Sequence, residues 1–136
     1  MLYMLDLAVH HLGYLVKKKD AAKAAFEALG YAETQPWGRD ESRGIDICFM
    51  KKNDLLVELV CPYRDDSDVS GLLKKMKNTP YHICYETASI EKTSKELRSL
   101  GFLPIKETAP APMLGGRNVI FFIHPAMGMI ELLETH

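Results

Sequence analysis

The sequence repeats itself at an interval of about half its length, and this internal repeat constrains the possible fold more than any other feature. At an offset of 71 residues, segment 11–14 (HLGY) aligns with segment 82–85 (HICY). At an offset of 73 residues, segment 57–60 (VELV) aligns with segment 130–133 (IELL). A period this long indicates two copies of one supersecondary unit, neither of which buries its apolar face alone. The repeat therefore predicts two similar modules that share one core.

Length and composition place the chain among ordinary globular domains. With 136 residues and a net charge of −1, it can form one core and has no charge excess that would attract nucleic acid. No run approaches the roughly 20 apolar residues that span a bilayer, and the first residues lack the basic start of a signal peptide. The three cysteines, an odd number, lie within or beside apolar runs, which is typical of reduced, buried thiols in a cytosolic protein. None has CxxC spacing, which argues against a zinc ion bound by cysteines. We therefore expect a cytoplasmic protein without nucleic-acid or membrane partners.

Local patterns predict the same order of elements in each half, namely a strand, a helix and then further strands. In the first half the predicted elements are strand 9–16, helix 20–29, an edge element at 33–43, and hairpin strands 44–50 and 55–61. In the second half they are strand 82–87, helix 89–100, a proline-rich loop, and strands 118–124 and 129–133. Asp20 and Ser89 are the expected N-caps, and Gly30 and Gly101 are the expected ends of the helices.

The predicted fold class is therefore α+β, with two βαβββ modules forming a curved mixed sheet around a groove. We expect a single domain over residues 1–136, with one module at about 7–62 and the other at about 80–134. Between them, apolar residues at positions 69, 72, 73 and 76 have helical spacing. This spacing predicts a linker helix at about 67–78.

The repeat also places one histidine and one glutamate at equivalent positions in each half, pairing His11 with His82 and Glu58 with Glu131. Both glutamates stand among apolar strand residues, where an unpaired buried carboxylate costs several kcal/mol. Two such carboxylates at matched positions suggest a common cation, and two imidazoles complete an N2O2 ligand set. We therefore predict that these four residues bind one divalent metal ion in the groove.

Other ionisable residues are not expected to bind the metal ion. Strand alternation puts His10 on the face opposite to His11. His124 precedes a proline at a strand end and is expected at the rim of the groove. Asp46 is a weaker candidate for proton transfer than the two glutamates. Two further residues could contact a substrate carboxylate or phosphate: Arg117 and Lys106.

Several motifs resemble the vicinal oxygen chelate superfamily of glyoxalase, bleomycin-resistance and dioxygenase proteins, in which paired βαβββ modules surround a metal. Within it, the closest resemblance is to the methylmalonyl-CoA epimerases, and lactoylglutathione lyase (glyoxalase I) comes second. The matching segments are 11–13 (HLG), 57–62 (VELVCP), 81–84 (YHIC), 115–125 (GGRNVIFFIHP) and 129–132 (MIEL). The resemblance implies metal ligation by His11, Glu58, His82 and Glu131. The lyase uses the same order of ligand types, so the quartet is compatible with both reactions.

The resemblance further implies an enzyme that transfers a proton α to a carbonyl through a chelated enediolate. Glu131 and Glu58 are the expected proton-transfer groups, because a ligating carboxylate can also act as a base. The N2O2 set suits Co, Ni, Mn or Zn. The implied substrate is an acyl-CoA such as methylmalonyl-CoA or, for the lyase, the methylglyoxal–glutathione hemithioacetal. The implied assembly is a homodimer.

A drug-binding resistance protein of the same fold is the main alternative without catalysis. Such proteins generally lack the four ligands, so the quartet argues against this alternative. An extradiol-type dioxygenase would have an apolar residue at the position that Glu58 occupies. The ligand pattern therefore favours metal-assisted proton transfer over both.

Overall fold

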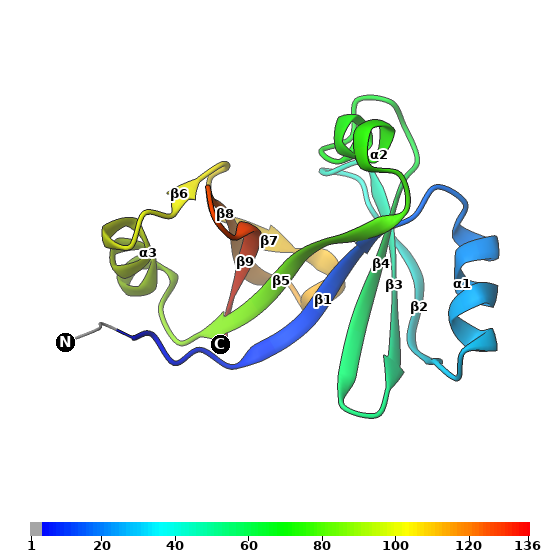
Figure 1. Cartoon of the computed structure of the whole chain (residues 1–136), viewed down its shortest axis with the longest axis horizontal. Coiled ribbons are helices and arrows are strands. Elements are labelled where there is room, and N and C mark those ends of the chain that lie inside the picture. Colours follow the sequence, from blue (N-terminus) through cyan, green and yellow to red (C-terminus); the bar gives the residue numbers. More distant parts are fainter. Residues whose placement is uncertain (1–3) are drawn as a thin grey trace.

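The computed structural model describes residues 4–136, and the elements of its first half follow the expected order (Figure 1). These elements are β1 (Val9–Leu15), α1 (Lys19–Ala28), β2 (Ala32–Asp40), β3 (Ile45–Lys52) and β4 (Leu55–Pro62). The polar segment expected as an edge element is the edge strand β2. The hairpin between β3 and β4 turns at Asn53, which adopts a left-handed conformation with φ of 53°. Asparagine tolerates this conformation better than most residues do, so the turn forms where the sequence predicts it.

The second half repeats this order after the linker helix α2 (Ser70–Met76). Its elements are β5 (Thr79–Thr87), α3 (Ile90–Ser99), β6 (Leu103–Pro104), β7 (Ala109–Ala111), the 3-10 turn η1 (Pro112–Leu114), β8 (Arg117–His124) and β9 (Gly128–Glu134). The proline-rich loop therefore contains two short strands that both pair with β8. None of the helices within residues 4–136 is long and apolar enough to cross a membrane.

The nine strands found in residues 4–136 form one mixed sheet in the order β2-β3-β4-β1-β5-β9-β8-β6, with β7 also pairing with β8. The two repeats meet in the middle, where β1 and β5 run antiparallel. Each of these central strands also pairs in parallel with the last strand of its own repeat, β1 with β4 and β5 with β9. Figure 1 shows α1 and α3 at opposite ends of the molecule, each beside its own half of the sheet. The structure confirms the α+β fold class and the mixed sheet.

Strands β3 and β4 are buried on both faces over most of their length, which explains their nearly continuous apolar sequence. On one face of β3, Ile45, Ile47 and Phe49 belong to a core cluster that also includes Val60 and Val69. On its other face, Cys48 and Met50 belong to a second cluster, which packs against Phe26 and Ala22 of α1. The face that carries Ile45, Ile47 and Phe49 is the one that faces the groove.

The helix ends differ in part from the sequence expectations. Ser89 caps α3 as expected, since its hydroxyl accepts a hydrogen bond from the Lys92 amide at 3.1 Å. The expected cap Asp20 instead lies in the first turn of α1, whose N-cap is Lys18 and has no side-chain hydrogen bond. The expectation for Asp20 was wrong because the N-cap lies two residues earlier, at Lys18. An acidic residue in the first turn still favours the helix by interacting with its positive end.

Candidate metal centre

Four side chains from four adjacent strands converge on one point in the middle of the sheet. His11 lies on β1, Glu58 on β4, His82 on β5 and Glu131 on β9, and these strands are neighbours in the order β4-β1-β5-β9. All four residues are buried, with exposed fractions between 1% and 4%. Each offers one ligand atom, and these atoms all lie within 4.8 Å of one another. The structure thus brings the predicted quartet together within one chain.

The distances between these atoms match those of ligands that share an ion. The Nε2 atoms of His11 and His82 lie 3.3 Å apart, and Oε1 of Glu131 is 3.2 Å from the first and 3.1 Å from the second. Oε1 of Glu58 is 3.5 Å and 3.7 Å from the same two nitrogens. With metal–ligand bonds of about 2.1 Å, two ligand atoms lie about 3.0 Å apart at a right angle and about 3.4 Å apart at the tetrahedral angle. The donor set therefore fits a first-row divalent metal.

The electrostatics of the quartet also favour a cation. Burial disfavours charge on Glu131, yet the close approach of the His11 and His82 imidazoles holds the pKa of this carboxyl well below its usual range. Burial likewise opposes a positive charge on His11, but the Glu58 and Glu131 carboxylates raise the pKa of this imidazole overall. Although both imidazoles are close, Oε1 of Glu131 has no partner in hydrogen-bond geometry among the described residues. A buried carboxylate oxygen in this position is well suited to a metal ion.

A glycine makes room for one of the two imidazoles. Gly13 pairs with His82 across β1 and β5, and it pairs with Glu58 across β1 and β4. A Cβ atom at Gly13 would lie only 2.0 Å from Cε1 of the His82 ring. The rings of Tyr81 and Phe121 flank the same imidazole edge-on, with centroids 4.4 and 5.3 Å away. The repeated HLGY motif thus supplies one predicted ligand and also the space for another.

His10 does not lie on the opposite face as strand alternation predicts. The pairing of β1 with β5 shifts between Val9 and His11, so His10 sits at an irregularity in the strand. Its ring packs edge-on against the His11 ring, with Nδ1 of each 2.8 Å from the other. The expectation was wrong because a bulge interrupts the two-residue alternation on which it rested.

A narrow cavity of about 30 Å³ lies beside the quartet, and it reveals groove residues that the sequence patterns missed. Glu58 and Glu131 line it together with Asp40, Arg43 and Tyr81. Asp40 is 1% exposed, and its two oxygens accept hydrogen bonds from the Ser42 hydroxyl at 2.7 Å and the Arg43 guanidinium at 2.7 Å. Because both oxygens are engaged, Asp40 orients Arg43 at the groove. The polar run at residues 40–43 has no periodicity that could have predicted this burial.

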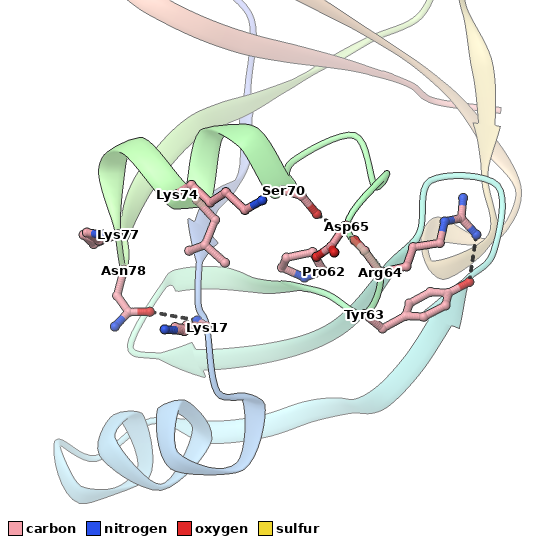
Figure 2. A pocket seen from close by; sticks show the side chains of 10 residues that line it. Lys17, Pro62, Tyr63, Arg64, Asp65, Ser70, Lys74, Lys77 and Asn78 are labelled. Atoms are coloured by element: carbon pink, nitrogen blue, oxygen red, sulfur yellow. Dashed lines mark hydrogen bonds between the residues drawn. The ribbon is translucent and has the colours of Figure 1, made fainter.

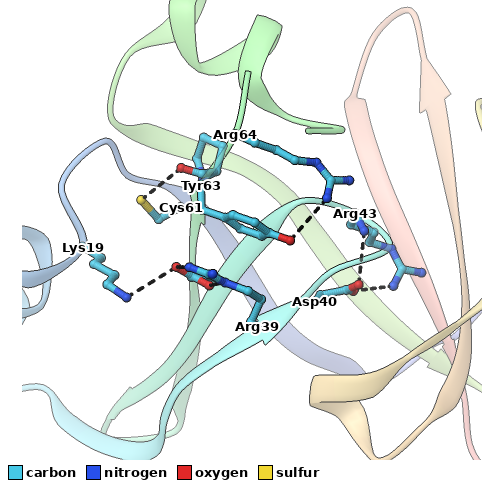
Figure 3. A network of polar contacts seen from close by, with 9 residues as sticks. Lys19, Arg39, Asp40, Arg43, Cys61, Tyr63 and Arg64 are labelled. Atoms are coloured by element: carbon cyan, nitrogen blue, oxygen red, sulfur yellow. Dashed lines mark hydrogen bonds and ion pairs between the residues drawn. The ribbon is translucent and has the colours of Figure 1, made fainter. Parts of the chain in front are cut away.

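The other predicted side chains lie outside the quartet. Asp46 is buried, but it lies on the β3 face opposite to the groove, next to the Arg39 and Lys19 side chains that Figure 3 labels; Arg39 donates to it at 2.8 Å and Lys19 lies 3.4 Å away. It is therefore excluded as a proton-transfer group and is instead the centre of a structural ion-pair network. His124 stacks near Phe102 with ring centroids 4.6 Å apart.

The two cations proposed to contact substrate are both engaged in ion pairs. Arg117 binds the Glu86 carboxylate at 2.9 Å and lines a cavity beside His10. Lys106 lies 2.5 Å from the Asp68 carboxylate and, with Arg43, lines a cavity next to the groove. The pair Lys106–Asp68 joins the second repeat to the segment before the linker helix.

A larger cavity of about 470 Å³ lies between the end of β4 and helix α2 (Figure 2). Its lining contains four basic residues, namely Lys17, Arg64, Lys74 and Lys77. Among the described residues, Asp65 is the one acidic residue in the lining. Its lining also includes Asn78, whose side-chain oxygen accepts a hydrogen bond from the Lys17 amide at 2.8 Å. Leu73 lines this cavity and, like Tyr81 of the groove, packs against the core cluster of Ile45, Ile47 and Phe49. We call it the basic cavity.

The paired βαβββ repeats in one sheet, with a His/Glu quartet at its centre, define a class of fold and candidate site, and comparison with known proteins identifies the family. The chain belongs to the Glyoxalase/Bleomycin resistance protein/Dioxygenase superfamily, whose family model matches residues 10–121. A relative from Bos taurus, the mitochondrial methylmalonyl-CoA epimerase, is 26% identical over 120 residues, which cover 87% of this chain and 67% of the relative. The ethylmalonyl-CoA/methylmalonyl-CoA epimerase of Cereibacter sphaeroides is 25% identical over 118 residues, covering 86% and 87% of the two chains.

Comparison with solved structures finds the same fold in methylmalonyl-CoA epimerases. A methylmalonyl-CoA epimerase variant from Streptomyces coelicolor, in complex with 2-nitronate-propionyl-CoA, superposes with a TM-score of 0.80. It is 23% identical, and the match covers 96% of each chain. This similarity shows a shared fold over nearly the whole chain. The family resemblance read from the sequence motifs is thus confirmed.

Proposed function

We propose that this protein is a metal-dependent enzyme that transfers a proton α to a carbonyl, of the methylmalonyl-CoA epimerase type. The observation that carries this proposal is the buried quartet, in which two imidazoles and two carboxylates approach within 4.8 Å of one another. The two curated relatives are both named as epimerases of malonyl-type thioesters, which supports the same reaction. The solved relative from Streptomyces coelicolor is bound to an acyl-CoA analogue, which supports an acyl-CoA substrate.

The proposed roles follow from the chemistry of the four side chains. His11, Glu58, His82 and Glu131 would hold one divalent ion, which would stabilise the negative charge that develops on a substrate carbonyl oxygen as the α proton leaves. A carboxylate oxygen of Glu131 or Glu58 would accept that proton, and return of a proton from the other side would invert the carbon. Both carboxylates border the same narrow cavity, so they face the same side of the sheet.

The basic cavity is the proposed site for the phosphate groups of the coenzyme A portion. Among the described residues, Lys17, Lys74 and Lys77 form no ion pair, so their ammonium groups are available to an anion. Arg64 is paired with Asp66 at 2.7 Å and adds positive potential nearby. Uncompensated cations around a cavity attract phosphate groups by charge, with an effect that salt weakens.

Exchange of the α proton of methylmalonyl-CoA with solvent deuterium tests the reaction directly, because it detects proton removal even when inversion is slow. We expect the metal-loaded protein to catalyse this exchange, and Glu131→Gln to lower the rate by about 10²–10⁴-fold. Glu27→Gln, which makes the same change on the exposed face of α1, should leave the rate unchanged. Metal content measured in parallel separates loss of the ion from loss of the base.

The same preparation should be offered the methylglyoxal–glutathione hemithioacetal. If it isomerises the hemithioacetal and does not exchange the α proton of methylmalonyl-CoA, the enzyme is a lactoylglutathione lyase and the epimerase proposal fails. If neither substrate reacts with the metal-loaded protein, both substrate assignments fail.

A further inference from the structure

The two predicted histidine ligands have different surroundings behind the metal-facing nitrogen. Nε2 of each ring points to the quartet, where the two atoms lie 3.3 Å apart. Nδ1 of His82 is buried and has no hydrogen-bond partner among the described residues. Nδ1 of His11, by contrast, lies 2.8 Å from Nδ1 of His10, the residue next to it in the chain. Of the two imidazoles, only that of His11 has a histidine nitrogen within hydrogen-bond distance of its Nδ1 atom among the described residues.

This contact depends on the irregularity in β1. In a regular strand, consecutive side chains point to opposite faces and cannot reach each other. The shift in β1–β5 pairing between Val9 and His11 turns the half-buried His10 ring toward His11, with the ring centroids 5.1 Å apart at 80°. The Cys84 side chain also lies within hydrogen-bonding reach of the His11 ring, but its thiol is directed to the Tyr85 carbonyl at 3.9 Å, and sulfur accepts hydrogen bonds weakly. His10 is thus the strong acceptor available to His11.

We propose that His10 is a positioning residue that fixes the tautomer and the ring orientation of His11. Two ring nitrogens 2.8 Å apart form one hydrogen bond with one shared hydrogen. A metal-binding Nε2 must be free of hydrogen, so Nδ1 of His11 carries the hydrogen and donates it to Nδ1 of His10. His10 then bears its own hydrogen on Nε2. This inference rests on the proposed metal site, although the hydrogen bond itself can be detected without a metal.

The first test is nuclear magnetic resonance of protein with ¹⁵N-labelled histidine rings. A hydrogen bond between two nitrogens transmits a scalar coupling, so we expect a measurable coupling between the Nδ1 atoms of His10 and His11 in the metal-free protein. The coupling should persist when zinc is added, and it should vanish in His10→Ala. Its absence from the folded wild-type protein would overturn the proposal. Because this measurement needs no metal, it stays decisive even if the protein binds no zinc and the proposed function fails.

The second test is zinc affinity, measured by competition with a chromophoric chelator. Loss of a residue that orients a metal-binding histidine typically costs about 10–100-fold in affinity, and we expect this loss for His10→Ala. In His10→Asn, the side-chain oxygen takes the place of Nδ1 as acceptor, so affinity should return to within a few-fold of wild type. His10→Phe keeps a ring of similar size without an acceptor, and it should be as weak as His10→Ala.

A histidine outside the site provides the control. His124→Asn makes the same chemical change at a residue that stacks near Phe102, and it should leave zinc affinity unchanged. Thermal unfolding of each variant identifies any that fails to fold. If folded His10→Phe binds zinc as tightly as wild type, or if His10→Asn is as weak as His10→Ala, ring packing or another effect replaces the hydrogen bond and the proposal is wrong.

Discussion

At the scale of single residues, the candidate metal centre depends on a residue without a side chain as well as on its four predicted ligands. Gly13 is the strongest case, because the His82 ring occupies the space in which any other residue would place its Cβ atom. Its backbone does not require glycine, since its φ is not in the left-handed region. The close approach of the His82 imidazole is therefore the structural reason why glycine fits at position 13.

We predict that Gly13→Ala weakens zinc binding by at least about tenfold, because the ring must move away from the other ligands. Competition with a chelator measures the effect. Gly71→Ala is the matched control: a Cβ atom there meets nothing within 4 Å, and alanine should stabilise α2 by up to about 1 kcal/mol. Wild-type zinc affinity in Gly13→Ala would show that the site can adapt and that the ring is not held by this contact.

At the scale of elements, the carboxylate of Asp46 connects β3 to β2 and to the start of α1. Arg39 makes two hydrogen bonds to it, at 2.8 and 3.1 Å, and Lys19 lies 3.4 Å away. Hydrogen bonding from Arg39 outweighs burial and lowers the pKa of Asp46. A lowered pKa in the folded state means that the stabilisation is present above the unfolded pKa and is lost as pH falls through the folded one.

We predict that Asp46→Asn lowers the free energy of unfolding at pH 7 by about 1–2 kcal/mol, a modest value because Arg39 is half exposed. The difference from wild type should shrink below about pH 4, where the carboxyl begins to protonate in the unfolded chain. Urea unfolding at pH 7 and pH 3 measures both values, and Asp6→Asn serves as an exposed control. An equal difference at the two pH values would contradict the role of the charge.

At the scale of the whole molecule, the proposal assigns the acyl group of the substrate to the metal quartet and the phosphates of coenzyme A to the basic cavity. Lys74 and Lys75 occupy the same last turn of α2, but only Lys74 lines the cavity. We predict that Lys74→Glu raises KM for methylmalonyl-CoA several-fold, or about 1 kcal/mol, while metal content stays unchanged.

Lys75→Glu carries the same charge change in the same helix turn and should have a much smaller effect. Steady-state rates at low and high salt measure both variants, and the difference between them should narrow as salt screens the charges. Equal KM values for the two variants at low salt would exclude the basic cavity as the site for the phosphates.

The sequence alone determined the repeated order of elements, the α+β class and the four residues that converge. Alternation along a strand and a repeat of about half the chain are periodic signals, and they survive in the order of residues without knowledge of strand pairing. Equivalent positions in two copies of one unit must meet when the copies share a sheet. This is why His11 and His82, and Glu58 and Glu131, could be matched in advance.

The tertiary structure alone decided the details that break periodicity. The irregularity at His10, the burial of Asp40 and the side of the sheet that Asp46 faces all depend on how β1, β2 and β3 pair with neighbours distant in sequence. The basic cavity likewise forms from β1, β4 and α2 together. Whether a strand shifts or a loop makes a contact depends on how side chains pack in the assembled sheet. A local sequence pattern cannot predict this, because the packing partners are distant in sequence.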